Sequence, residues 1–175
     1  MSEPPASEGE AFLAWEPQHG LCVECRFNWD ERNFDQMIAK CTSDVDAFVE
    51  VFDVIDPTVP VDSGLWSANR YLWHTVDVQR FGAERFWTLR VDASFGVPAW
   101  EENATAEVRS YDQLSPKAGL IALVSASEIW LRAALEAPRD ASTPHPEAGT
   151  ITAFDLVQRN GHEVCHHLFD VRRAQ

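Results

Sequence analysis

The chain has 175 residues and carries 14 Lys and Arg against 28 Asp and Glu, a formal net charge of −14 at pH 7. So acidic a surface repels phosphate backbones and anionic lipid headgroups, which argues against nucleic-acid binding and against electrostatic membrane docking. Hydrophobic residues make up 45% of the sequence, enough for the core of one globular domain and too many for a disordered chain.

The N-terminal segment, residues 1–32, has no helical or strand periodicity and contains three prolines. We interpret it as an irregular arm in which Trp15, Phe27 and Trp29 are pinned to the surface of the domain that follows. The segment lacks the basic region and the apolar run of a signal peptide. No stretch of the sequence reads as an uninterrupted apolar membrane span. We therefore expect a soluble, cytoplasmic protein with no membrane partner.

The second segment, residues 33–175, is predicted to form one helical domain. Apolar residues recur there at steps of three and four, which is the pattern of amphipathic helices. Ser115 is a good N-cap with Pro116 at the first helical position, and Thr152 with Asp155 resembles a capping box. The predicted helices cover about residues 33–55, 65–89, 115–135 and 150–175.

The connections between these helices read as irregular. Residues 91–114 contain Gly96, Pro98 and Asn103, residues 137–149 contain three prolines and a glycine, and neither segment shows the alternation of a strand. Four helices of about this length with such connections predict an all-α fold, a four-helix bundle with an irregular N-terminal arm.

The fourth helix contains a dense group of possible metal ligands in the sequence NGHEVCHHLFD. His162 and His166 are spaced i, i+4, which places both imidazoles on one side of a helix, where they can clamp a divalent metal. Glu163 and His167 form a second i, i+4 pair, turned by about 100° around the helix axis. The sequence alone leaves open which pair faces inward.

A third ligand is expected from another helix, and His74 is the best candidate. It lies in the aromatic sequence YLWHTVDV, where a buried histidine is costly unless a partner satisfies it. His19 and His145 lie in loops beside prolines and are expected to be solvated. Together with one of the two i, i+4 pairs, His74 predicts a metal site.

Cys22 and Cys25 form a C-x-x-C motif in the arm. A zinc site needs a second pair of ligands, and none is evident nearby in the sequence. We interpret the pair as two reduced thiols, and a metal or redox role is the alternative. Cys41 and Cys165 lie in helical patterns and are expected to be small buried side chains.

Four segments in order along the chain resemble the DinB-like metal-binding four-helix bundles, especially the actinobacterial members. CVECRFNWD resembles their C-x-E-C-G-F-x-[WY]-D segment, with Arg26 in place of the usual glycine, and LWSANRYLWHTVDV resembles their second helix. VPAWEENA and HEVCHHLFDV resemble the loop and the closing helix. The chain lacks the glutamate of the family's second-helix motif, where it has Asn69 and Arg70.

The resemblance implies one histidine from the second helix and two i, i+4 ligands from the fourth, around zinc, nickel or a similar divalent ion. Carried over to this chain, the ligands are His74, His162 and His166. For an enzyme with this site, we expect Glu163 to act as the catalytic acid or base, or else as a partner that orients an imidazole. The related mycothiol-dependent maleylpyruvate isomerases have an E-x-x-x-H-x-x-D pattern, and alignment on that pattern makes Glu163 and His167 the ligands instead. We favour His162 and His166.

The resemblance also implies a class of reaction. Its members include enzymes that use a low-molecular-weight thiol such as mycothiol, so we expect a metal-dependent S-transferase, or a related hydrolase or isomerase, acting on a small molecule. A non-catalytic metal-binding or stress-response module is the alternative. Asp77 and Asp170 each follow a histidine by one helical turn and are expected to orient it. A homodimer is possible, with Trp100 or Trp130 as exposed markers of its face.

Overall fold

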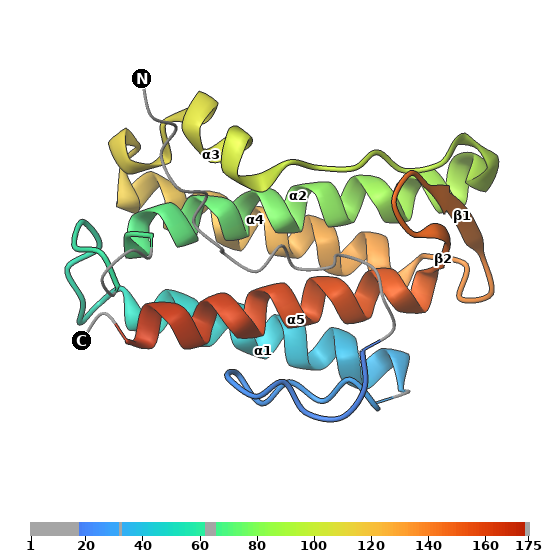
Figure 1. Ribbon diagram of the computed structural model, residues 1–175, viewed down its shortest axis with the longest axis horizontal. Helices are drawn as coiled ribbons and strands as arrows, with labels where there is room; N and C mark the ends of the chain where they lie inside the picture. The colour runs from blue at the N-terminus through green and yellow to red at the C-terminus, as the bar shows by residue number, and fades with distance from the viewer. Residues whose placement is uncertain (1–17, 32, 62–65, 174–175) are drawn as a thin grey trace, which may run out of the picture.

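The structure is a computed structural model that describes residues 18–31, 33–61 and 66–173. Four long helices form the bundle predicted from the sequence, as Figure 1 shows, and they are α1 (Phe34–Val51), α2 (Ala68–Asp92), α4 (Pro116–Leu135) and α5 (Ala153–Arg172). Trp15 and its predicted contact lie outside the described residues.

The order of the helices in the bundle differs from their order in the chain. α2 packs against α4 and α5, and α1 packs against the same two helices, so α1 and α2 face each other across the diagonal. The colour gradient in Figure 1 shows that α1 and α5 run in one direction and that α2 and α4 run in the other. Because α2 and α4 are parallel, the chain must return along the whole bundle between them.

This return accounts for the long connection between α2 and α4. It holds the 3-10 turn η1 (Ala93–Phe95), the helix α3 (Glu102–Arg109) and the turn η2 (Tyr111–Gln113), so the expectation of a wholly irregular segment is wrong. Asn69 on α2 is buried and donates hydrogen bonds to the carbonyls of Tyr111 and Leu114, both at 2.9 Å. These bonds tie the end of the connection to the start of α2.

The predicted starts of α4 and α5 are confirmed. The Ser115 hydroxyl accepts a hydrogen bond from the amide of Ala118 at 3.3 Å. Thr152 caps α5 in a reciprocal capping box: its hydroxyl accepts from the Asp155 amide at 3.1 Å, and the Asp155 carboxylate accepts from the Thr152 amide at 2.8 Å. Local hydrogen bonding therefore sets where the helix with most of the candidate ligands begins.

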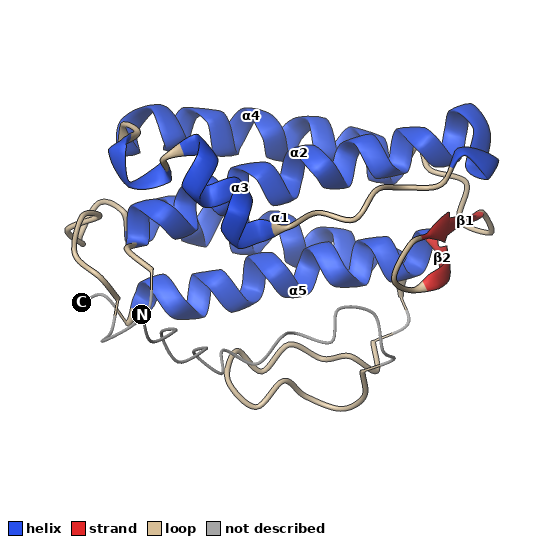
Figure 2. Cartoon of the chain, turned by 45° about the horizontal axis from the view of Figure 1, so that its top comes forward, coloured by secondary structure: helices blue, strands red, loops and turns tan. Residues whose placement is uncertain are grey.

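A small antiparallel hairpin, which the sequence did not predict, precedes α5. Its strands are β1 (Ser142–His145) and β2 (Gly149–Thr152), and Figure 2 shows them at the end of the bundle. His145 is buried instead of solvated, because its Nδ1 accepts hydrogen bonds from the amides of Glu147 and Ala148, both at 3.2 Å, and closes the turn. The hairpin covers the end of the core with Ile151.

The loop of residues 18–31 lies against α5. It is held by an antiparallel bridge between Leu21 and Asn28, and Phe27 and Trp29 are 1% and 5% exposed. These aromatic side chains form part of the hydrophobic core instead of lying on its surface. The Trp29 carbonyl accepts a hydrogen bond from the Gln158 side chain of α5 at 2.7 Å. The arm is therefore attached to the bundle at a defined position.

Among the described residues, α4 is the one helix long and apolar enough to cross a membrane by length and composition. The same test is passed by core helices of bundles, and α4 packs between α1 and α2 with Leu123 and Trp130 fully buried. Trp130 therefore marks no dimer face, and Trp100 is only partly exposed. The cytoplasmic location stays a prediction.

Candidate metal centre

His74 lies in the first two turns of α2 and is completely buried. Its ring stacks on Trp100 at a centroid distance of 5.1 Å and meets the edge of Trp66 at 5.4 Å. Neither ring nitrogen makes a hydrogen bond within the described part of the chain. Burial lowers the pKa of His74, so the imidazole is neutral and offers a lone pair.

Glu163 and His167 of α5 complete a three-residue group with His74. Glu163 Oε2 lies 3.8 Å from His74 Nε2 and 3.3 Å from His167 Nε2. All three ligand atoms lie within 4.8 Å of one another. Nitrogen and oxygen ligands on one tetrahedral zinc ion are separated by about 3.4 Å, so these spacings fit a shared ion.

His167 is oriented by Asp170 on the next turn of α5. The two side chains approach at 3.2 Å between Nδ1 and Oδ2, so Nδ1 donates to the carboxylate and Nε2 faces Glu163. A carboxylate behind a histidine is the usual support for a metal ligand. Asp77 does not support His74 in this way: it accepts hydrogen bonds from Tyr111 and Arg109.

The charges of this group depend on one another. Burial opposes the charged form of His167, but Asp170 and Glu163 outweigh it and raise the pKa of His167 to about 9. Burial also opposes ionisation of Glu163, yet the two imidazoles hold the pKa of its carboxyl well below the ordinary value. Without a metal, the site therefore contains a protonated His167 paired with ionised Glu163.

Further charged side chains act on the same site. Burial and the charge of Glu163 raise the pKa of Glu102, on α3, to about 7, although the residue as a whole is exposed. Burial lowers the pKa of Arg85 and of Arg159, and the negative charge of Glu163 opposes both shifts. Side chains of both charge signs therefore interact electrostatically with Glu163.

The structure does not bring His74, His162 and His166 into one group. His162 and His166 lie instead beside Cys22 and Cys25 of the N-terminal loop, with the four ligand atoms within 4.8 Å of one another. Successive residues are rotated by about 100° on an α-helix. α5 therefore directs Glu163 and His167 toward His74, and His162 and His166 toward the loop.

His162 is also buried, with 2% of its surface exposed. Its ring lies 4.4 Å from Trp29 and 5.4 Å from Phe27, between centroids. Burial lowers the pKa of His162 to about 4, so this imidazole too is neutral at pH 7.

The sequence does contain a signal for the pairing of Glu163 with His167. It is the E-x-x-x-H-x-x-D spacing that ends at Asp170.

The residues of the first group fit a divalent ion. His74 offers two buried nitrogens with no hydrogen bond among the described residues, and Glu163 supplies a carboxylate. Imidazole and carboxylate donors suit zinc, nickel, iron or manganese. Three protein ligands leave a position for a small molecule, as sites of catalysis do.

The family of the chain follows from its sequence as a whole. The family model of the DinB superfamily matches residues 9–169, so the chain belongs to that superfamily. The resemblance noted in the sequence is thereby confirmed. No curated protein matches the chain in sequence.

Solved structures show the same fold at low sequence identity. YfiT from Bacillus subtilis, described as a probable metal-dependent hydrolase with an unusual four-helix bundle topology, is 15% identical with a TM-score of 0.73, over 91% of this chain and 94% of its own. The mycothiol-dependent maleylpyruvate isomerase is 12% identical with a TM-score of 0.67, over 80% of this chain and 61% of its own. A further four-helix bundle protein is 20% identical with a TM-score of 0.58, over 78% of this chain and 95% of its own.

Proposed function

We propose that this protein is a metal-dependent enzyme that transfers a low-molecular-weight thiol to a small electrophilic molecule. The observation that carries the proposal is the group of His74, Glu163 and His167, whose ligand atoms lie within 4.8 Å of one another in the bundle. A divalent ion held there lowers the pKa of a bound thiol or water and so supplies a nucleophile at neutral pH.

The chain's own residues have separate tasks in this proposal. His74 and His167 would hold the ion with neutral imidazoles, and Glu163 would supply one negative charge. Binding would release to solvent the proton that His167 carries in the metal-free protein. Asp170 keeps His167 in the tautomer that directs Nε2 inward. Glu163, expected from the sequence to be an acid or base, is a ligand here because its carboxylate lies between the two imidazoles.

Aromatic side chains around His74 and His167 would shield a metal-bound nucleophile from bulk water. Trp66 and Trp100 contact the ring of His74 on two sides, and Tyr71 lies 5.1 Å from His167 between ring centroids. Aromatic walls exclude water and strengthen charge interactions inside the site. Glu102, whose pKa is raised to about 7 by burial and by the charge of Glu163, would exchange a proton with a reacting molecule in this proposal.

A thiol is preferred to water as the nucleophile because a structural neighbour is described as mycothiol-dependent. The neighbour described as a probable metal-dependent hydrolase favours water. The two reactions differ in their products. With a thiol, the sulfur forms a bond to the substrate carbon, the thiol proton is released and the leaving group departs with its electron pair. With water, oxygen takes the place of sulfur.

The experiment compares thiol and water directly. Zinc- or nickel-loaded protein is mixed with mycothiol or another small thiol and with 1-chloro-2,4-dinitrobenzene, and thioether formation is followed by absorbance. A parallel assay with an activated ester and no thiol measures hydrolysis. The proposal predicts that His74→Ala and Glu163→Gln reduce thioether formation to the uncatalysed rate.

His19→Ala is the matched control, because His19 is exposed on the N-terminal loop and touches no ligand of this group. It is expected to keep the wild-type rate. If wild type and His74→Ala form thioether equally slowly with every thiol, the transferase proposal is wrong. Ester hydrolysis that depends on His74 would then favour the hydrolase.

A further inference from the structure

The loop of residues 18–31 forms a tight turn at the C-x-x-C motif. The Cys22 amide donates to the Phe27 carbonyl at 2.9 Å, and the Arg26 amide donates to the Cys22 carbonyl at 3.0 Å. Arg26 has φ of 63°, in the left-handed region that favours glycine. A non-glycine residue in this conformation carries a strain cost, so the turn is held by its surroundings.

The same loop is fixed on α5 by buried contacts on both sides of the motif. Phe27 and Trp29 pack on the ring of His162, and a Cβ on Gly161 would lie 3.3 Å from the Phe27 ring. The Cys165 thiol of α5 lies 3.7 Å from the Cys25 carbonyl and donates to it. The two cysteines of the turn are therefore held in place above α5.

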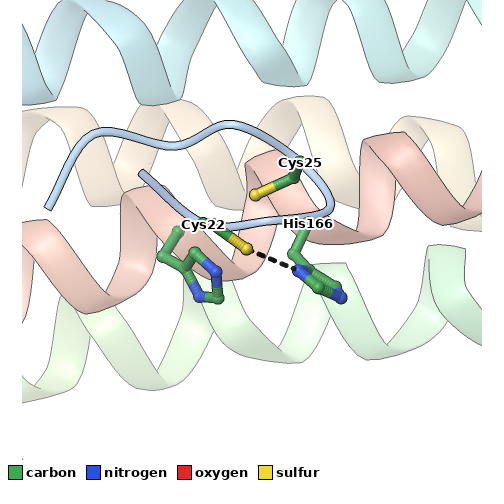
Figure 3. A group of neighbouring side chains, drawn as sticks. Cys22, Cys25 and His166 are labelled. Carbon is green, nitrogen blue, oxygen red and sulfur yellow. Dashed lines mark hydrogen bonds between the residues drawn. The ribbon is translucent and has the colours of Figure 1, made fainter. Parts of the chain in front are cut away.

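Four possible ligands converge at this contact. Figure 3 shows Cys22 and Cys25 on the loop beside α5, with the Cys22 sulfur facing His166 at 3.8 Å from Nδ1. With His162, the four ligand atoms lie within 4.8 Å of one another. A sulfur and a nitrogen on one tetrahedral zinc ion are separated by about 3.6 Å, close to the distance found here.

The orientation of His166 is set from its other side. Its Nε2 lies 3.3 Å from the Glu24 carboxylate, on the same loop. When Nε2 donates to that carboxylate, Nδ1 carries the lone pair and faces the sulfur of Cys22. A carboxylate behind a histidine is the arrangement that supports metal ligands in proteins.

From this geometry we infer a second metal site, in which Cys22, Cys25, His162 and His166 bind one zinc ion with closed tetrahedral coordination. Binding releases one proton from each cysteine thiol, and the two thiolates balance the two positive charges of the ion. Because all four positions are filled by protein, the site is structural and leaves no place for a substrate. Its task is to fasten the N-terminal loop to α5.

The second site is independent of the proposed catalytic group and shares only the helix α5 with it. Its ligands differ in kind, since the group of His74, Glu163 and His167 contains no sulfur. A thiolate-to-metal signal therefore reports on the second site alone. Partial exposure of Cys22 and Cys25 gives an ion a path of entry.

The test replaces zinc with cobalt in the reduced, full-length protein under anaerobic conditions. Cobalt bound tetrahedrally by thiolates gives an intense charge-transfer band in the near ultraviolet and d–d bands in the visible. We expect these bands at one equivalent of cobalt in wild type and in His74→Ala. We expect the charge-transfer band to disappear in Cys22→Ser and Cys25→Ser and on addition of zinc. This band is the readout, because cobalt held by His74, Glu163 and His167 has d–d bands but no thiolate band.

Cys165→Ser is the matched control, because Cys165 contacts the loop but lies outside the four ligands. It is expected to keep the bands. Glu24→Gln should weaken zinc binding by about 10- to 100-fold while leaving the spectrum unchanged, as expected for a residue that positions a ligand. Loss of the bands in Cys165→Ser would overturn the ligand set.

A second measurement uses wild-type protein alone and so does not depend on how the variants fold. Alkylation of the thiols is followed by peptide mass mapping, with and without zinc. Zinc should protect Cys22 and Cys25 at least tenfold and leave the rate at Cys165 unchanged. Equal alkylation with and without zinc, or a disulfide between Cys22 and Cys25 that persists under reducing conditions, would falsify the site.

Discussion

Residues 162–167 of α5 supply ligands to two different groups. Residues 162 and 166 face the N-terminal loop, whereas residues 163 and 167 face α2. The two pairs differ by a single step along the helix, which is a rotation of about 100°. At the scale of single residues, the chemistry of each group is then set by its neighbours: a carboxylate and a buried histidine on one side, two thiols on the other.

His167 should give the metal-free protein a characteristic dependence on pH. Its pKa is about 9 in the folded chain against an ordinary value of 6.5. A pKa raised by folding means that protonation stabilises the fold, fully below pH 6.5 and progressively less as pH rises to 9. We expect the free energy of unfolding of metal-free wild type to fall across this interval.

His167→Gln is the comparison for this prediction, because it removes the titrating group and keeps a polar side chain. Urea unfolding in the presence of a chelator, at pH 6.5 and at pH 9, gives the two free energies for each protein. Wild type should lose more stability than the variant between these values. An equal loss in both would show that His167 is not the group responsible.

At the scale of elements, α5 depends on the structure that precedes it. The β1–β2 hairpin leads directly into the capping box of Thr152 and Asp155. The cap satisfies amides of the first turn that have no partner within the helix. Because the helix begins at a defined residue, the later ligands on α5 also have a defined position along the bundle.

Removal of this cap should destabilise the fold without removing a ligand. Thr152→Ala is expected to lower the free energy of unfolding by about 1 kcal/mol, the usual cost of losing an N-cap hydroxyl. Thr150→Ala is the control, because Thr150 is exposed on β2 and makes no capping bond. The comparison is made by urea unfolding, and equal stability of the two variants would contradict the role of the cap.

At the scale of the whole molecule, the acidic composition affects the binding of cations as well as of anionic partners. A net charge of −14 disfavours anionic partners and also attracts cations to the surface. The bundle places two groups of metal ligands on either side of α5, one between helices and one under the N-terminal loop. Zinc at both positions would link α2, α5 and the loop, so metal content and stability should change together.

Zinc should therefore raise the melting temperature through two independent contributions, one from each metal site. At a free zinc concentration of about 100 times the Kd, each independent site contributes about 2.7 kcal/mol, which corresponds to about 5 to 10 °C for a chain of this size. Elemental analysis should give two ions in wild type and one in either His74→Ala or Cys22→Ser. An unchanged melting temperature on zinc addition to wild type would contradict this expectation.

Periodicity, caps and composition were enough to predict the bundle. The steps of three and four in α1, and the cap of Ser115 with Pro116, are local patterns that need no distant contact. The helix α3 and the β1–β2 hairpin were missed because both are short and their apolar residues few. The turn of the hairpin is closed by hydrogen bonds from the amides of Glu147 and Ala148 to the His145 ring. These bonds exist only in the folded turn, so the sequence pattern did not predict them.

The sequence by itself determined that histidines, a glutamate and cysteines are present at ligand spacing, because i, i+4 and C-x-x-C are local relations. Only the tertiary structure decided how they combine. His74 meets Glu163 and His167, and the C-x-x-C motif finds its second pair in His162 and His166 more than a hundred residues away. The physical reason is that a helix buried on several sides presents each face to a different neighbour, and only packing selects which neighbour that is.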